Sequence, residues 1–369
     1  MAIKGANIRV LVVDDSAVYR TLITTNLASK PGIEVVGSAS DAIDAQEKIA
    51  TLKPDVVSLD VEMPKMSGIE LTKKLMANST IPIILVSAAN INIFEALQAG
   101  AVDFVKKPDA TRSVTPEAFI TELASKIKIA SVAKVSKHTP IIRNTTTSQN
   151  RNSVSSVSSS LNSIIGKTVG NCSDQVCNSI IIALGASTGG TEATLEVLQR
   201  LPAKVPPILI VQHMPVGFTK LYAERLNRIC AMKVKEAEDG DTVVPGCVYV
   251  APGDCQMVVT RLGSTYKLRC RGNEKVSGHC PSVDVLFHSV AKEFGRHSVG
   301  IILTGMGKDG AAGLLEMRKN GAYTLGESQE SCVVYGMPMV AQNIGAVATQ
   351  ATNKEIPNLL MKHLATLGK

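Results

Sequence analysis

Residues Ile180–Thr194 read IIIALGASTGGTEAT, an apolar run followed by a glycine-rich turn and the first residues of a helical pattern. The run Ile180–Leu184 predicts a buried strand, because it is short, continuous and bounded by a turn signal. Gly185-Ala-Ser187-Thr-Gly189 match the G-x-S-x-G pattern, in which a sharp strand-to-helix turn exposes a serine hydroxyl above a sheet. The stretch therefore predicts an α/β sheet with Ser187 at its edge.

The use of this serine is a separate question. A helix that begins near Thr191 would direct its N-terminal N–H groups toward negative charge forming beside Ser187, as a nucleophile requires. Glycine-rich strand-to-helix turns also cradle phosphates, or only allow close packing, in many α/β proteins. The turn alone therefore leaves a nucleophilic serine as one of two interpretations.

Length and composition set limits on the rest of the chain. With 369 residues, the chain exceeds one comfortable core, so we expect two domains. No apolar run reaches the ~18 residues of a membrane span and the N-terminus lacks a signal-peptide layout, so we expect a cytoplasmic protein without direct membrane insertion. The eight cysteines have no zinc-binding spacing and are expected to be thiols.

The front part of the chain alternates apolar runs with amphipathic stretches. This alternation predicts a five-stranded parallel sheet with helices on both faces. The expected strands are Ile8–Val13, Glu34–Ala39, Val56–Leu59, Ile83–Val86 and Asp103–Val105. Ligands of such sheets bind beyond the carboxyl ends of the strands, so the residues that follow each run are the candidates for chemistry.

Acidic residues follow the first and third of these runs. Asp14 and Asp15 come after the first strand and Asp60 ends the third. Three carboxylates at one sheet edge would repel one another unless a hard divalent cation lay among them, and oxygen ligands suit Mg²⁺. The sequence therefore predicts a magnesium site formed by these aspartates.

The same edge carries the groups for phosphoryl transfer. A carboxylate such as Asp60 can attack a phosphoryl donor, and the hydroxyl of Ser87 and the ammonium of Lys107 can bind the new oxygens. Taken singly, Asp and Ser at strand ends are also common turn formers. Their joint placement favours the phosphoryl interpretation.

Residues 8 to about 128 resemble response-regulator receiver domains, which have a flavodoxin-like fold. The resemblance rests on the acidic pair, the aspartate, the Ser and the Lys-Pro after successive strands, and it implies that Asp60 is phosphorylated. It also implies Mg²⁺ binding by Asp14, Asp15 and Asp60, binding of the phosphoryl group by Ser87 and Lys107, a switch aromatic at Phe104, and a cis peptide bond at Lys107-Pro108.

The composition of the chain changes after the front domain. Residues 139–160 read TPIIRNTTTSQNRNSVSSVSSS and show no sustained apolar period. Such a segment buries too little surface to offset its ordering entropy, so we expect residues 131–178 to be a flexible basic linker. Its basic residues are not clustered and lack interleaved aromatics, so no nucleic-acid binding is expected.

From residue 179 onward the pattern again predicts a doubly wound, mostly parallel α/β domain. Val258–Thr260 and Lys267–Arg269 are expected to form a hairpin added to the sheet. The expected strands are Ile180–Leu184, Ile208–Val211, Val248–Val250 and Val299–Leu303, and the expected helices are Thr191–Arg200, Thr219–Ile229, Val283–Phe294 and Ala311–Lys319.

Two further strand ends supply partners for the serine. Ile208–Val211 runs into Gln-His213-Met-Pro, and Val299–Leu303 runs into a glycine-rich loop that contains Asp309. A histidine and an aspartate beside Ser187 complete the set for general-base activation of an alcohol. Taken alone, His213 is better explained as a satisfied polar residue at a strand end, and Asp309 as the N-cap of the helix near Ala311.

The whole chain, with GASTGG, QHMP and TGMGKDG behind a receiver, resembles the CheB family of chemotaxis protein-glutamate methylesterases. The order Ser, His, Asp differs from that of α/β-hydrolases. The stretch Pro281–His288 also looks like a family signature, whereas Met339 stands where a basic residue is expected.

The resemblance implies a catalytic domain at residues 179–369 behind a receiver at residues 1–130. It implies hydrolysis of glutamate 5-methyl esters on methyl-accepting chemotaxis receptors, which releases methanol, and deamidation of selected receptor glutamines, with a chemotaxis histidine kinase as phosphodonor. Ser187 would attack, His213 would carry the proton, and Asp309 would orient His213. The backbone N–H groups of Thr188 and Met306 would form the oxyanion hole.

Two other functions compete with this hypothesis. A signalling adaptor would keep the phosphorylation and lack catalysis, but the intact serine, histidine and aspartate argue against it. A DNA-binding regulator would need a helix-turn-helix pattern behind the linker, and the sequence has none. No cofactor is expected for the esterase reaction.

Overall fold

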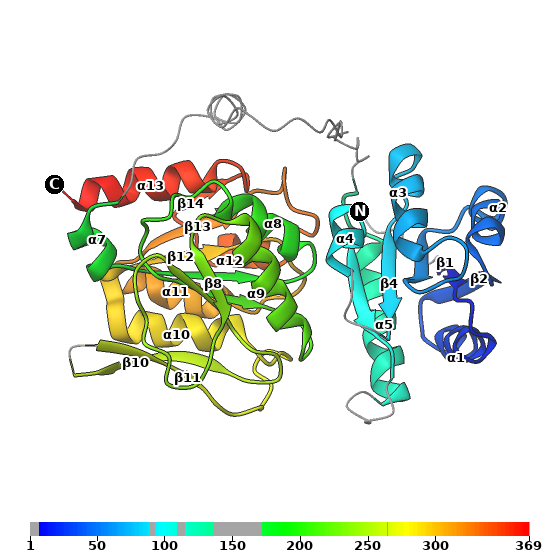
Figure 1. The fold of residues 1–369 in the computed structure, drawn as a ribbon, viewed down its shortest axis with the longest axis horizontal. Helices are drawn as coiled ribbons and strands as arrows, with labels where there is room; N and C mark the ends of the chain where they lie inside the picture. Colours follow the sequence, from blue (N-terminus) through cyan, green and yellow to red (C-terminus); the bar gives the residue numbers. More distant parts are fainter. Residues whose placement is uncertain (1–6, 89–92, 109–114, 136–171, 264, 369) are drawn as a thin grey trace, which may run out of the picture.

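The computed structural model describes residues 7–88, 93–108, 115–135, 172–263 and 265–368. Figure 1 shows two α/β units side by side, the receiver-like front unit and the larger rear unit. Within these ranges, none of the helices combines the length and apolar character needed to cross a bilayer.

The front unit is the five-stranded parallel sheet that the sequence predicts, with strand order β2-β1-β3-β4-β5. Successive residues of a strand point to opposite faces, and accordingly Val10 and Val12 pack against one pair of helices, α1 and α5, while Leu11 and Val13 pack on the other face. The strands are β1 (Ile8–Val13), β2 (Ile33–Ala39), β3 (Val56–Asp60), β4 (Ile83–Ser87) and β5 (Asp103–Lys106), and the helices are α1 (Ala17–Ala28), α2 (Ala42–Leu52), α3 (Gly68–Asn78), α4 (Ile93–Gln98) and α5 (Pro116–Ala130).

The rear unit is built on a seven-stranded parallel sheet of order β14-β13-β12-β6-β7-β9-β8. Helices cover both of its faces, so the doubly wound prediction is confirmed. Its strands are β6 (Ile181–Ala186), β7 (Ile208–Gln212), β8 (Lys233–Glu236), β9 (Cys247–Val250), β12 (Ser298–Ile302), β13 (Tyr323–Glu327) and β14 (Thr349–Ala351). Its helices are α7 (Asp174–Ser179), α8 (Gly190–Leu198), α9 (Phe218–Ile229), α10 (Val283–Phe294), α11 (Ala311–Lys319), α12 (Met337–Asn343) and α13 (Ile356–Leu367), with a 3₁₀ turn at Gly295–His297.

The predicted hairpin forms, but it is not part of the main sheet. Strands β10 (Met257–Leu262) and β11 (Thr265–Cys270) form a separate antiparallel, two-stranded sheet. Met257, Val259 and Leu268 are buried in one cluster with the apolar face of α10. The hairpin therefore closes over α10, and its apolar face is satisfied there without joining the sheet.

The range expected to be a linker is described only at its two ends. Residues 136–171 lie outside the described part of the chain. At the C-terminal end, Cys172, Val176 and Cys177 are buried in the rear core, and Ser173 caps α7 by accepting from the N–H of Val176. Residues 172–177 therefore pack with the rear unit.

Candidate active site

Ser187 lies in a tight turn between β6 and α8, as its sequence pattern predicts. Its N–H donates to the carbonyl of Thr304 at 3.0 Å, and the turn passes through Gly189 at a φ of 77°, which favours glycine. Gly305 comes so close that a β-carbon added there would lie 2.7 Å from the Cβ of Ser187. The loop after β12 is therefore pressed against the serine.

Ser187 and His213 follow neighbouring parallel strands. Ala186 of β6 is in register with Gln212 of β7, so Ser187 and His213 are the next residue on each strand. The His213 N–H donates to the Ala186 carbonyl at 3.2 Å, and Gln212 Nε2 donates to the Ser187 carbonyl at 2.9 Å. The sheet thus brings the two backbones together at one edge.

His213 and Asp309 are in direct contact. His213 Nε2 lies 2.8 Å from Asp309 Oδ2, and both side chains are buried. An ionised carboxylate only accepts, so Nε2 carries the proton of this hydrogen bond, and in the neutral imidazole Nδ1 then keeps its lone pair. Nδ1 is buried and has no hydrogen-bond partner in the described part of the chain. Within the same residues, the Ser187 hydroxyl is hydrogen-bonded to neither side chain.

Asp309 is held by the N-terminus of α10. Its carboxylate accepts from the Ser282 hydroxyl at 2.8 Å, from the Val283 N–H at 2.8 Å and from the Asp284 N–H at 3.0 Å. Burial alone would raise the pKa of Asp309, but the His213 contact and these donors outweigh it and lower the pKa to about 2. The carboxylate therefore stays ionised at neutral pH.

The alternative role of Asp309 as an N-cap is wrong. Helix α11 is preceded by Gly310 at a φ of 86° and has no side-chain cap. The Asp309 side chain turns instead toward α10, whose N-terminal N–H groups attract negative charge. Asp309 thus precedes α11 in the sequence, but its side chain accepts hydrogen bonds from the N-terminus of α10.

The candidates for the oxyanion hole flank the serine. The backbone N–H groups of Thr188 and Met306 have no hydrogen-bond partner among the described residues. Thr188 is buried and its hydroxyl donates to a carboxylate of the front unit, whereas the Met306 side chain is exposed. Both N–H groups remain available to an oxyanion.

Sequence reasoning missed His279, which stacks on the His213 ring. The ring centroids are 3.7 Å apart and the planes differ by 8°. Burial, and next the neighbouring His213, lower the pKa of His279 to about 4. Ser282 was also missed as a functional residue, although the stretch Pro281–His288 that contains it was singled out.

The front site brings the three predicted aspartates together. One oxygen each of Asp14, Asp15 and Asp60 lies within 4.8 Å of the others, a donor set that fits a hard divalent cation. Lys107 Nζ lies 2.8 Å from Asp14 and 2.7 Å from Asp60. Burial raises the pKa of Asp60 to about 6, Lys107 opposes this shift and Asp14 adds to it.

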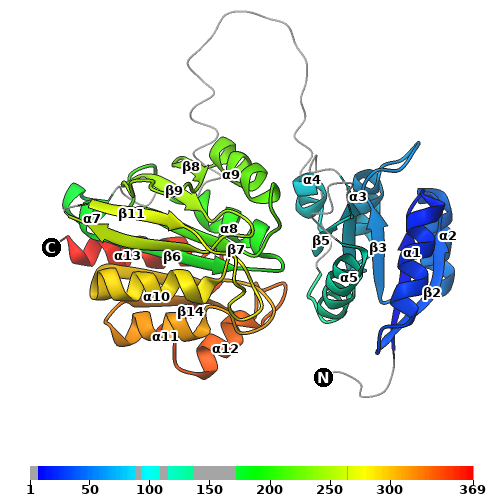
Figure 2. The same cartoon turned by 90° about the horizontal axis from the view of Figure 1, so that it is seen from below.

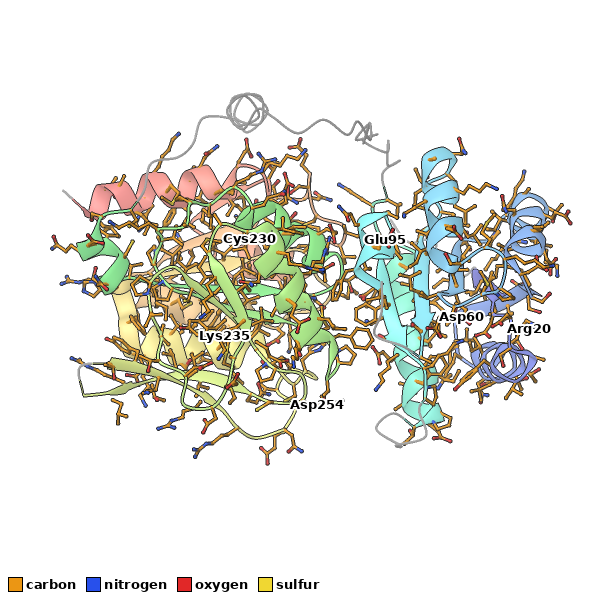
Figure 3. All side chains as sticks on the ribbon, in the orientation of Figure 1. Arg20, Asp60, Glu95, Cys230, Lys235 and Asp254 are labelled. Atoms are coloured by element: carbon orange, nitrogen blue, oxygen red, sulfur yellow. The ribbon has the colours of Figure 1, made fainter. Side chains whose placement is uncertain are left out.

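The remaining front residues are also in this region. Ser87 ends β4 and is fully buried, and Lys107 follows β5 directly. Figure 3 labels Asp60 in the front unit, farther from the rear unit than Glu95 of α4. The expected cis bond at Lys107-Pro108 is wrong, since the cis peptide bond of the described residues is Cys280-Pro281.

The front unit contacts the rear site beside Ser187. Figure 2 shows β6 running toward the front unit, with α4, β5 and α5 facing it. The Thr188 hydroxyl donates to Asp103 Oδ2 at 2.7 Å, and Lys126 Nζ holds Asp103 Oδ1 at 2.9 Å. Phe104 is buried against Phe218, with ring centroids 4.5 Å apart. Asp103 therefore reaches the residue next to the serine.

Comparisons with known proteins agree with this architecture. The CheB methylesterase family model matches residues 182–360, and the response regulator receiver domain model matches residues 10–116. The chain is 46% identical over 355 residues to protein-glutamate methylesterase/protein-glutamine glutaminase 2 of Syntrophomonas wolfei, covering 96% of this chain and 97% of the relative. It is 44% identical over 346 residues to the protein-glutamate methylesterase/protein-glutamine glutaminase of Escherichia coli K12, covering 93% of each.

Among solved structures, the CheB methylesterase catalytic domain of Thermotoga maritima is 35% identical and covers 50% of this chain and 98% of that chain, with a TM-score of 0.49. The near full-length relatives and the two family models decide the assignment. The chain belongs to the protein-glutamate methylesterase/protein-glutamine glutaminase family and is a chemotaxis response regulator with that hydrolase activity.

Proposed function

We propose that this enzyme hydrolyses glutamate 5-methyl esters of methyl-accepting chemotaxis receptors, and deamidates selected receptor glutamines, through Ser187, His213 and Asp309. The observation that carries the proposal is the hydrogen bond of His213 Nε2 to Asp309, at 2.8 Å, with Nδ1 left without a partner in the described residues. A base needs a free lone pair and a fixed tautomer, and this arrangement supplies both.

The reaction is an acyl transfer in two halves. Ser187 Oγ forms a bond to the ester carbonyl carbon while its proton passes to His213 Nδ1, and the bond to methoxide breaks as that proton is returned, which gives methanol. A water molecule then attacks the acyl-serine in the same way and releases the glutamate carboxylate. With a glutamine the leaving group is ammonia, so one apparatus serves both substrates.

Charge develops on the carbonyl oxygen during each attack. The N–H groups of Thr188 and Met306 are the proposed donors to this oxyanion, and their lack of partners among the described residues supports the assignment. Gly305 supports it as well, because only a residue without a side chain lets this loop pass so close to Ser187.

Regulation is proposed to begin at Asp60. A chemotaxis histidine kinase supplies the phosphoryl group, Asp60 accepts it, and Ser87 and Lys107 bind its oxygens. Asp14, Asp15 and Asp60 would hold Mg²⁺, which supplies positive charge beside the phosphoryl oxygens when bound. Phe104 follows the change, since it lies on the strand that leads to Lys107 and packs on Phe218 of the rear unit.

Without phosphorylation the front unit is proposed to restrict access to the serine. The hydrogen bond from Thr188 to Asp103, at 2.7 Å, supports this because Thr188 is adjacent to Ser187 and its N–H belongs to the proposed oxyanion hole. Phosphorylation would weaken this contact and raise activity. The domain limits of 1–130, 131–178 and 179–369 and a cytoplasmic location remain predictions.

The test is methanol release from receptor membranes that carry methylated glutamates. Ser187→Ala is expected to abolish release above background, whereas Ser179→Ala, in α7, retains the parental rate. Asp60→Asn is expected to keep basal release but lose the increase caused by a small-molecule phosphodonor with Mg²⁺. Parental release by Ser187→Ala would overturn the mechanism, and activation of Asp60→Asn would overturn the regulation.

A further inference from the structure

The imidazole of His213 has a partner on its face as well as on its edge. Asp309 binds the edge through Nε2, and the His279 ring covers one face at a centroid distance of 3.7 Å with the planes 8° apart. Nothing in the proposed acyl transfer uses His279. A partly buried histidine in parallel contact with a general base is therefore a feature that the mechanism leaves unexplained.

A tight turn fixes the position of His279. The N–H of Val276 donates to the His279 carbonyl and the N–H of His279 donates to the Val276 carbonyl, both at 3.0 Å. Ser277 and Gly278 between them have φ values of 53° and 87°, the pattern of a type I′ turn. Gln256 Nε2 also donates to the His279 carbonyl at 3.3 Å. The backbone under the ring is thus tied on both sides.

The same segment continues into the residues that hold Asp309. Gln256 Oε1 accepts from the Ser282 N–H at 2.9 Å, and the Ser282 hydroxyl donates to Asp309. The Ser277 hydroxyl donates to Asp284 at the start of α10 at 3.3 Å. The short segment of residues 276–282 therefore carries both His279, which stacks on the His213 ring, and Ser282, which binds the Asp309 carboxylate that holds His213.

The surroundings keep His279 uncharged. Burial lowers its pKa to about 4, and the charges of His213, Lys275 and Lys126 act in the same direction, while Asp309 opposes them. At neutral pH the ring is a neutral aromatic face. A neutral aromatic face attracts a cation placed over it. A protonated imidazole would repel the same cation.

We propose that His279 is a positioning residue for this hydrolase: its ring fixes the plane of the His213 imidazole and stabilises the imidazolium that forms when His213 accepts the serine proton. The proposal rests on the proposed role of His213 as the base. His279 exchanges no proton in the step. The proton moves from Ser187 Oγ to His213 Nδ1 and then to the leaving methoxide.

The experiment compares three substitutions in the full-length protein, with phosphodonor present. His279→Ala and His279→Leu remove the aromatic face, and His279→Phe keeps it. Because the face acts on the charged state of His213, we expect kcat for methanol release to fall about 5- to 30-fold in the Ala and Leu variants, with KM changed by less than about twofold. His279→Phe is expected to remain within about threefold of the parent.

Two controls separate this role from general stability and from the proposed function. His363 stacks on Tyr323 at 4.3 Å outside the site, so His363→Ala removes a stacked histidine without touching His213 and should leave kcat unchanged. An unchanged kcat in His279→Ala, or equal kcat values in the Leu and Phe variants, would overturn the inference. Ser187→Ala, measured in parallel, should be inactive; if it is active, the proposed function fails and this inference fails with it.

Discussion

Two buried aspartates, one in each unit, lie at the carboxyl edge of a parallel sheet and have opposite electrostatics. Asp60 ends β3 beside Asp14 with one lysine between them, and burial raises its pKa to about 6. Asp309 lies among four donors, His213, a hydroxyl and two N–H groups of α10, and its pKa is lowered to about 2. Both folds place a carboxylate at the edge of a sheet, and the hydrogen-bond donors around each carboxylate determine whether its pKa is raised or lowered.

The comparison teaches how one chain can carry a switch and a catalyst on similar sheets. Asp60 has few hydrogen-bond donors, so its ionised form is unfavourable in this buried position. A bound cation or a covalent phosphoryl group therefore changes the electrostatics around it strongly. Asp309 has its donors built in, so it remains ionised and holds one tautomer of His213. The predictions below test this difference, beginning with the largest effect.

Asp309→Asn removes the charge that fixes the His213 tautomer. The amide keeps the shape of the side chain, but it can present an N–H to the histidine and favour the wrong tautomer. We expect kcat for methanol release to fall about 10³- to 10⁴-fold, as the loss of a triad carboxylate does elsewhere. Asp174→Asn, whose side chain is 85% exposed, is the matched control and should match the parent. A loss below tenfold in Asp309→Asn would contradict this account.

The stability of the two sites should depend on pH in opposite directions. The folded pKa of Asp60 is raised, so its contribution to stability is full below its unfolded pKa of about 4 and is lost as pH rises through about 6. The folded pKa of Asp309 is lowered, so its contribution is present above about 4 and is lost as pH falls toward 2.

Denaturant unfolding without Mg²⁺ measures this difference. At pH 7.5 we expect Asp60→Asn to raise the free energy of unfolding by ~2 kcal/mol and Asp309→Asn to lower it by ~2 kcal/mol. At pH 4 the gain of Asp60→Asn should disappear. Changes of the same sign in the free energy of unfolding of both variants at pH 7.5 would contradict the proposed difference between Asp60 and Asp309.

Asp103→Ala tests whether the front unit restrains the rear site. The change removes the acceptor of the Thr188 hydroxyl, so basal methanol release should rise about threefold to tenfold without a phosphodonor. Glu122→Ala is the control, because Glu122 pairs with the same Lys126, at 3.4 Å, whereas the Thr188 hydroxyl donates to Asp103. Equal basal rates for the parent and Asp103→Ala would argue against restraint through this contact.

Ser282→Ala is expected to have a much smaller effect on kcat than Asp309→Asn. It removes one of the donors to Asp309 and the N-cap of α10, while the two backbone N–H groups and His213 remain. We expect kcat to fall about threefold to tenfold and the free energy of unfolding to fall by ~1 kcal/mol. Ser289→Ala, within the same helix, is the matched control for kcat. A loss as large as that of Asp309→Asn would show that the hydroxyl, and not the helix end, holds the carboxylate.

Much of this architecture could be predicted from local sequence. Apolar runs followed by turn residues marked the central strands, and the polar residues after them gave Ser187, His213, Asp309 and Asp60. The two edge strands, β8 and β14, and β13 beside β14 were missed because they are short and carry several polar residues. The hairpin was expected in the sheet, since the sequence does not say that its apolar face would meet α10.

Other parts of the site depend on contacts between distant segments. The role of Asp309 at α10 could not be seen because the adjacent helix, α11, offered a simpler explanation. His279 is placed by a turn with two positive φ values and stacks on a residue of another strand end. Its neighbours in sequence, Gly278 and Cys280, carry no signal for such a contact.

The measurement that tests the central claim most directly is the tautomer of His213 in the full-length protein at pH 7.5. Nitrogen-15 NMR of histidine-labelled protein, with the His213 signals assigned by their loss in His213→Gln, reports which ring nitrogen carries a proton. The account predicts a protonated Nε2 bonded to Asp309 and an unprotonated Nδ1. A proton on Nδ1 with an unprotonated Nε2, or an imidazolium at this pH, would contradict it.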